Sequence, residues 1–155
     1  MLMINKRSLS DKIHLGLATL FGIGYLPLCP GSFSCLAAVF VFILFGGSET
    51  FFIITALSVV ISFPVSERAE KIFQVKDSKK IVIDDFSGML ISFLFIPKKI
   101  EFIIVGFFLF RMLDMFKVPP ADRIEKLNGA KGIVGDDLVA GAYACGILNL
   151  ARLFL

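Results

Sequence analysis

The sequence has few charged residues, a single histidine, three cysteines and no tryptophan. Charged residues make up 19% of the chain and hydrophobic residues 57%, whereas soluble domains average about 25% and about 45–50%. A mean hydropathy of +0.86 implies more apolar surface than a globule of 17.1 kDa can bury. The shortage of charge therefore disfavours a soluble protein and predicts that lipid surrounds part of the chain.

The charges and thiols that are present exclude several other classes. A formal net charge of +3 is too small to indicate binding of nucleic acid. Cys29, Cys35 and Cys145 lack the spacing of metal ligands, and their odd number gives no disulfide framework. His14 stands alone, which disfavours zinc. Residues 1–14 contain no apolar core of the kind found in a removable signal peptide.

Five apolar segments predict the main helices, and they cover residues 33–45, 51–63, 81–96, 100–116 and 138–155. Their continuous Phe, Ile, Leu and Val runs have no polar face, and no alternating period supports a barrel. Each segment is shorter than the roughly 20 residues of a usual span, but interfacial ends and bilayer thinning allow crossing. The segment 81–96, roughly 24 Å long as a helix, is alternatively a re-entrant or half-buried helix.

The N-terminal region adds a surface element. Ile13, Leu17 and Leu20 fall at helical spacing within residues 1–20, which predicts an amphipathic helix on the membrane surface. The predicted fold is therefore all-α: a single domain over residues 1–155, forming a compact multi-helix membrane bundle of about five short apolar helices and a surface N-terminal helix. A soluble all-helical bundle is the alternative.

Basic residues indicate the orientation of this bundle. Of the sixteen Lys and Arg residues, most lie in the N-terminal segment, in residues 67–80 and in residues 117–131, which fall on one side if five segments alternate. Lys98, Lys99 and Arg152 lie toward the other side. The positive-inside rule then predicts a cytoplasmic N-terminus and an outside C-terminus.

Two pairs of adjacent carboxylates interrupt the apolar pattern. Asp84 and Asp85 lie inside the run 81–96, where an ionised carboxylate without a partner costs several kcal/mol. Asp136 and Asp137 precede the last apolar segment, and Asp136 is alternatively the N-cap of that helix. Ionisable residues at such places are by default candidates for a functional site.

Two further groups of residues fall on the same predicted side as the carboxylates. Arg111 and Asp114 share a helix face at i, i+3 spacing, and Lys117 continues it; a structural ion pair is the alternative. The loop 22–33 contains three glycines and two prolines. Its backbone amides, with the helix N-terminus at Ser32, fit a phosphate, although an ordinary interfacial turn fits equally well.

Clustered carboxylates without histidine or cysteine partners favour a hard cation with oxygen ligands, for which Mg²⁺ is the natural choice. With Arg111, Lys117 and the glycine loop as groups for a phosphate dianion, the sequence indicates metal-assisted phosphoryl hydrolysis at a membrane surface. A small membrane transporter or channel subunit with an ion or proton relay is the alternative, and a non-catalytic scaffold is a third. A relay requires charges spread across the bilayer, whereas these gather at one side.

Four ordered blocks of the sequence resemble the phosphatidylglycerophosphatase A family. They are Gly22-Ile-Gly-Tyr-Leu-Pro-Leu-Cys-Pro-Gly-Ser32, Asp77 with Ile81-Val-Ile-Asp-Asp-Phe-Ser-Gly-Met89, Phe110-Arg-Met-Leu-Asp-Met-Phe-Lys117, and Gly129-Ala-Lys-Gly-Ile-Val-Gly-Asp-Asp-Leu-Val-Ala-Gly141. Asp85 stands where the family usually has Glu, Ser34 replaces a glycine, and Cys35 replaces a serine. Val118 interrupts Lys-Pro, and Ala130 replaces a glycine.

The resemblance implies an integral membrane protein of bacteria. Together with the apolar segments and the distribution of basic residues, it predicts a multi-pass protein of the inner (cytoplasmic) membrane with its active site facing the cytoplasm. It also implies a Mg²⁺-dependent phosphatase that converts phosphatidylglycerophosphate to phosphatidylglycerol, although the family includes soluble all-helical relatives. The residues that it assigns are metal ligands, phosphate-binding cations and further substrate contacts. These are Asp84, Asp85, Asp136 and Asp137 for the metal, Arg111 and Lys117 for the phosphate, and Gly24, Pro30, Gly31, Ser32, Asp77 and Asp114 for the substrate.

Overall fold

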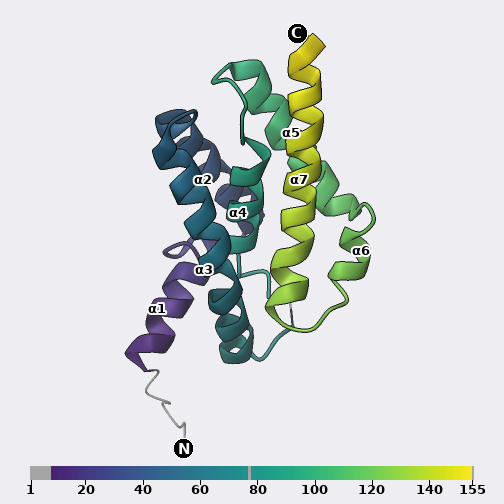
Figure 1. Ribbon diagram of the computed structural model, residues 1–155. Coiled ribbons are helices and arrows are strands. Elements are labelled where there is room, and N and C mark those ends of the chain that lie inside the picture. The colour runs from purple at the N-terminus through teal and green to yellow at the C-terminus, as the bar shows by residue number, and fades with distance from the viewer. Residues whose placement is uncertain (1–7, 77, 155) are drawn as a thin grey trace, which may run out of the picture.

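The computed structural model describes residues 8–76 and 78–154, and in these ranges the chain forms helices joined by short connections (Figure 1). The elements are α1 (Leu9–Ala18), the 3-10 helix η1 (Ile23–Tyr25), α2 (Pro30–Phe45), α3 (Glu49–Phe73), α4 (Ile83–Ser92), α5 (Ile100–Phe116), α6 (Ala121–Ile124) and α7 (Ala130–Phe154). The described residues include no strand, so the all-α prediction is confirmed.

The chain runs up and down the long axis of the bundle. In Figure 1, α2 rises, α3 descends, α4 and the turns after it rise, α5 descends, and α7 rises to the C-terminus. Two side chains tie the upper ends together: Lys98 Nζ donates to the Leu44 carbonyl at 3.2 Å, and Arg152 Nη1 to the Phe95 carbonyl at 2.6 Å. The α3–α4 and α6–α7 connections lie at the opposite, lower end.

Helix α4 lies at the centre of the molecule. It packs against α2, α3, α5 and α7, and seven of its ten residues are buried. The predicted helix over 81–96 was too long, because the helix ends at Ser92 and spans only about 15 Å. Phe95 has a left-handed φ of +65°, and Pro97 follows, so the helix cannot continue to residue 96.

Helices α3 and α7 are longer than the apolar segments that predicted them. Each has 25 residues, and these are the two described helices that are long and apolar enough to cross a membrane. Helices α2 and α5 have 16 and 17 residues, and α5 has the predicted bounds. Because α7 begins at Ala130, Asp136 lies inside the helix, and its interpretation as an N-cap was wrong.

Helix α1 confirms the predicted N-terminal helix, but with a different buried face. Leu15 and Ala18 are buried and pack with Val65 and Ala69 of α3, whereas Ile13 is 55% exposed. The part of the prediction that covers residues 1–7 lies outside the described residues. The helix therefore docks on α3 through small and apolar side chains and leaves Ile13 at the surface.

Helices α4 and α7 rise side by side and touch through two glycines. A Cβ atom on Gly141 would collide with the Gly88 carbonyl, and one on Gly88 would lie 2.7 Å from the Asp137 carbonyl oxygen. Small residues let helix backbones approach this closely. Gly88 and Gly141 each lie four residues, about one helical turn, after Asp84 and Asp137, so the same contact brings these carboxylates level.

We expect Gly141→Ala to destabilise the protein by about 1–3 kcal/mol, because the added methyl must push the two helices apart. Gly146→Ala is the matched control on the same helix, since a Cβ there meets no heavy atom within 4 Å. Thermal unfolding in detergent measures both variants. Equal melting temperatures for the two would contradict the close contact between α4 and α7.

Candidate active site

A cavity of about 320 Å³ opens at the end of the bundle that carries the α3–α4 connection. It is lined mainly by polar and charged side chains from α4, α5 and α7 and by the start of α2. The lining residues are Cys29, Pro30, Gly31, Ser78, Lys79, Ile81, Asp84, Asp85, Arg111, Asp114, Lys117, Ile133, Asp136 and Asp137.

Three carboxylates in this cavity have the geometry of a metal site. Asp84, Asp85 and Asp137 each offer an oxygen atom, and these atoms lie within 4.8 Å of one another. Asp84 and Asp137 are buried, and Asp85 is half-buried. Negative charges this close and this sheltered from water repel strongly unless a cation lies between them or protons are taken up. An all-oxygen donor set of this kind suits Mg²⁺.

Helix geometry explains why these three groups meet. Asp84 and Asp85 are in the first turn of α4, where the Asp84 carboxylate accepts the Asp85 N–H at 2.9 Å. Carboxylates are stabilised by the positive end of the helix dipole at this position. Asp137 comes from the second turn of α7, which runs beside α4 through the Gly88–Gly141 contact.

Arg111 joins two carboxylates with one nitrogen atom. Its Nη1 lies 2.6 Å from Asp85 Oδ1 and 2.9 Å from Asp114 Oδ2. All three side chains are less than a quarter exposed, so water screens the attraction between their charges less than at an open surface. The predicted face with Arg111 and Asp114 is confirmed, and Arg111 also reaches a candidate metal ligand on another helix.

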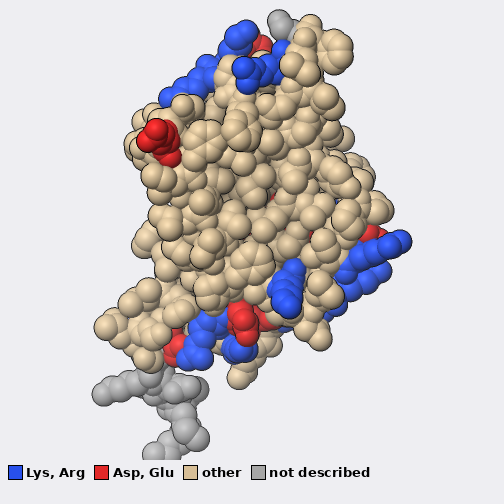
Figure 2. Space-filling model, in the orientation of Figure 1, with Lys and Arg blue, Asp and Glu red and all other residues tan. Residues whose placement is uncertain are grey.

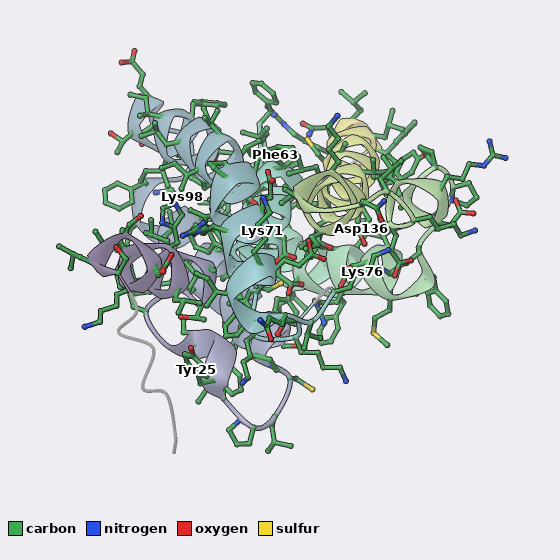
Figure 3. All side chains as sticks on the ribbon, turned by 90° about the horizontal axis from the view of Figure 1, so that it is seen from below. Tyr25, Phe63, Lys71, Lys76, Lys98 and Asp136 are labelled. Atoms are coloured by element: carbon green, nitrogen blue, oxygen red, sulfur yellow. The ribbon has the colours of Figure 1, made fainter. Side chains whose placement is uncertain are left out.

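Asp136 faces a different partner from its neighbour. It accepts a hydrogen bond from Lys117 Nζ at 2.7 Å, and the same ammonium group lies 2.9 Å from Glu125. Partial burial lowers the pKa of Lys117, but the hydrogen bonds to Asp136 and Glu125 outweigh it and raise the pKa above its ordinary value. Lys117 therefore stays charged, and its role as a phosphate-binding group stays a prediction. In Figure 3, Asp136 lies among the helices and not at the outer edge of the molecule.

The glycine loop contributes to the cavity only at its end. Pro30 and Gly31 line the cavity, and a Cβ on Gly31 would collide with the Asp85 carboxylate. Ser32 does not line it, and its N–H donates to the Cys29 carbonyl at 2.9 Å. Gly24 instead packs against the Lys80 carbonyl. The backbone anion site that the sequence suggested is thus reduced to the neighbourhood of Gly31, because Pro30 has no N–H.

Some residues in and beside the cavity were missed by sequence reasoning. Lys79 and Ser78 line the cavity although neither was assigned a role, and their only signal was their place at the end of the basic stretch 67–80, shortly before Asp84. Glu125 gave no signal, because its contact with Lys117 depends on the turn through α6. Asp77, which was predicted to contact substrate, lies outside the described residues.

Comparison with known proteins gives a consistent result. The family model described as Phosphatidylglycerophosphatase A matches residues 16–152. Phosphatidylglycerophosphatase A of Escherichia coli strain K12 is 32% identical, with 93% of this chain and 86% of the relative aligned. The Haemophilus influenzae protein of the same name is 34% identical over 91% of this chain and 89% of its own length.

A third relative has a different name. It is a putative phosphatidylinositol-3-phosphatase of Bacteroides thetaiotaomicron, 28% identical over 88% of this chain and 91% of the relative. No solved structure matches the chain significantly. The family model covers nearly the whole sequence, including all the described residues that line the cavity. The chain therefore belongs to the phosphatidylglycerophosphatase A family of phosphatases.

Proposed function

We propose that this enzyme is a Mg²⁺-dependent lipid phosphatase that hydrolyses phosphatidylglycerophosphate to phosphatidylglycerol and phosphate. The observation that carries the proposal is the convergence of Asp84, Asp85 and Asp137 in a cavity that Arg111 also lines. The substrate follows from the names of the two relatives at 32% and 34% identity. The third relative is named for another lipid phosphomonoester, so the shared chemistry is removal of a phosphate from a lipid headgroup.

The donor set fits a divalent cation. The three grouped carboxylates would hold it. Asp136 was also predicted as a metal ligand, but in the structure its carboxylate pairs with Lys117 and is not one of the three grouped carboxylates. When bound, such a cation supplies charge stabilisation at the phosphoryl oxygens and a water of lowered pKa. Arg111 contacts Asp85 in the same cavity, so the cavity would hold a metal on its carboxylates and a phosphate dianion beside its cationic side chains.

Three side chains of this enzyme would position the metal-binding carboxylates and the phosphate of the substrate. Arg111 fixes Asp85 through its 2.6 Å ion pair and lies where its guanidinium can meet phosphate oxygens. Lys117 fixes Asp136 in the same way from the C-terminal end of α5. Asp114 also pairs with Nη1 of Arg111, so the guanidinium is oriented before the substrate binds.

A membrane location is supported by the surface of the molecule. Figure 2 shows Lys, Arg, Asp and Glu gathered near the two ends of the visible face, with a broad uncharged band between them. Large apolar side chains on α2, α3, α5 and α7 are exposed. Examples are Phe40 at 61%, Leu57 at 54%, Val60 at 68%, Phe108 at 62% and Leu150 at 60%. So many exposed apolar side chains are typical of helices that face lipid.

The orientation of this bundle leads to a labelling prediction. Single cysteines replace Thr50 at the upper end and Lys76 or Asn128 at the lower end, in a background without the native three; all three positions are exposed. An impermeant thiol reagent added to intact cells should label residue 50 and leave 76 and 128 protected. Labelling of 76 or 128 from outside would contradict a cytoplasmic cavity. Ser78 is unsuitable as a probe because it is only 8% exposed.

The transporter alternative is disfavoured by the position of the charges. The ionisable side chains of the interior converge on one cavity near the lower end, whereas a relay needs a path across the bilayer.

The direct test of the substrate supplies the purified protein with phosphatidylglycerophosphate or phosphatidylinositol 3-phosphate and follows both lipids by mass spectrometry. We expect faster conversion of phosphatidylglycerophosphate; faster conversion of the inositol lipid would contradict the proposed substrate.

A further inference from the structure

Lys79 differs from the other cations that line the cavity. Arg111 pairs with Asp85 and Asp114, and Lys117 pairs with Asp136 and Glu125. Within the described ranges, 8–76 and 78–154, no ion pair involves Lys79, which lines the cavity with an exposed side chain. A lysine at the cavity rim that forms no ion pair within these ranges can bind an anionic group of the ligand.

The backbone holds Lys79 at this rim. The Ile81 N–H donates to the Ser78 carbonyl at 2.8 Å, which closes a turn around Lys79 and Lys80. The Val82 N–H donates to the Ala18 carbonyl at 2.9 Å, and Gly24 packs against the Lys80 carbonyl. The turn is thus fixed between the end of α1, the η1 loop and the start of α4, while the four-carbon stem of the lysine stays adjustable.

The neighbouring Lys80 points to a different environment. Its Nζ lies 5.5 Å from the ring centroids of both Tyr25 and Phe73, and it does not line the cavity. Tyr25 lies at the outer edge of the molecule in Figure 3. The two adjacent lysines therefore lie in separate environments: Lys80 contacts aromatic rings, and Lys79 lines the cavity.

The proposed substrate contains two phosphates, and the inference rests on that proposed function. The terminal phosphomonoester belongs beside the carboxylates and Arg111, which leaves the phosphodiester that remains in the product without a protein cation. We propose that Lys79 binds this phosphodiester and is a specificity-determining residue, which selects lipids with a second phosphate in the headgroup. Lys79 is exposed whereas Asp84 and Asp137 of the same cavity are buried, so the lysine lies nearer the exterior from which the lipid must enter.

The test compares Lys79→Ala with Lys80→Ala in neutral detergent micelles that contain Mg²⁺. Lys79→Ala should raise KM for phosphatidylglycerophosphate and the inhibition constant of phosphatidylglycerol about tenfold, as expected for loss of one charged hydrogen bond. Its kcat and the inhibition constant of inorganic phosphate should change by less than about twofold, because the reacting phosphate is bound elsewhere. Lys79→Arg should restore most of the affinity, and Lys80→Ala should behave as wild type.

Each other outcome overturns the assignment. An equal rise in both inhibition constants would place Lys79 on the reacting phosphate, and unchanged constants would show that it binds neither. Equal losses in both alanine variants would mean a general attraction of anionic lipid to the surface. Absence of wild-type turnover would instead contradict the proposed function, and with it this subsite, whereas wild-type turnover with unchanged binding of phosphatidylglycerol contradicts the subsite alone.

Discussion

Asp137→Asn is expected to lower kcat by at least about 10³-fold, because removing one ligand charge costs several kcal/mol of metal-assisted stabilisation of the transition state. Asp137 is the α7 member of the three grouped carboxylates, and its side chain is almost wholly buried. Asp84→Asn should have a similar effect from the α4 side. Both changes keep the size of the side chain, so the variants should fold and insert as the wild type does.

Two measurements separate loss of the metal from loss of the fold. Isothermal titration with Mg²⁺ should show much weaker binding in both variants, and thermal unfolding should stay near that of the wild type. Glu101→Gln is the control, since this carboxylate is exposed at the start of α5, far along the helix from the cavity. Full turnover of Asp137→Asn or Asp84→Asn at limiting Mg²⁺ would show that these residues do not hold the metal.

Arg111→Lys is expected to lower kcat/KM by about 10²-fold, because an ammonium group cannot reproduce the two-sided geometry of a guanidinium. The single nitrogen Nη1 serves Asp85 and Asp114, which leaves the other guanidinium nitrogens for the phosphate, whereas a lysine would have to make all three contacts from one nitrogen. Steady-state kinetics with increasing substrate should show the loss chiefly in kcat, since the interaction strengthens as charge develops on the phosphoryl group.

The alternative role for Arg111 is purely structural. In that case Arg111→Lys should lower the melting temperature and leave kcat/KM of the folded fraction nearly unchanged. Removing Arg111 and Asp114 together does not distinguish the roles, because Asp85 also depends on Arg111. Asp114→Asn is the better second variant for this comparison, because it removes one of the two ion pairs of Arg111 and leaves the pair with Asp85.

The sequence predicted the elements of this site better than their contacts. The largely apolar segment 100–116 predicted the bounds of α5 although it contains three charged residues, and the cost of burying charge singled out Asp84, Asp85, Asp136 and Asp137. All four line the cavity. What the sequence did not reveal is that Asp136 and Asp137 face different partners. Neighbours on a helix point about 100° apart, and which one faces α4 depends on packing between helices.

The start of α7 was predicted poorly for a related reason. The last apolar segment was expected from residue 138, yet α7 begins at Ala130, and Gly132 and Gly135 lie within it. A Cβ on Gly132 would collide with the Leu127 carbonyl, and one on Gly135 would lie 2.5 Å from a methyl of Ile124. These glycines let the polypeptide around α6 pack closely on α7, and such tertiary contacts override helix propensity.

The central claim is that a metal held by the grouped carboxylates removes phosphate from phosphatidylglycerophosphate. Release of inorganic phosphate by the purified protein in neutral detergent tests it most directly, with Mg²⁺, then with excess chelator, and then with Mg²⁺ restored. The account predicts equal amounts of phosphate and phosphatidylglycerol with Mg²⁺, no release with chelator, and full recovery on restoration. Release that continues unchanged in chelator, or no release by folded protein with Mg²⁺, would contradict it.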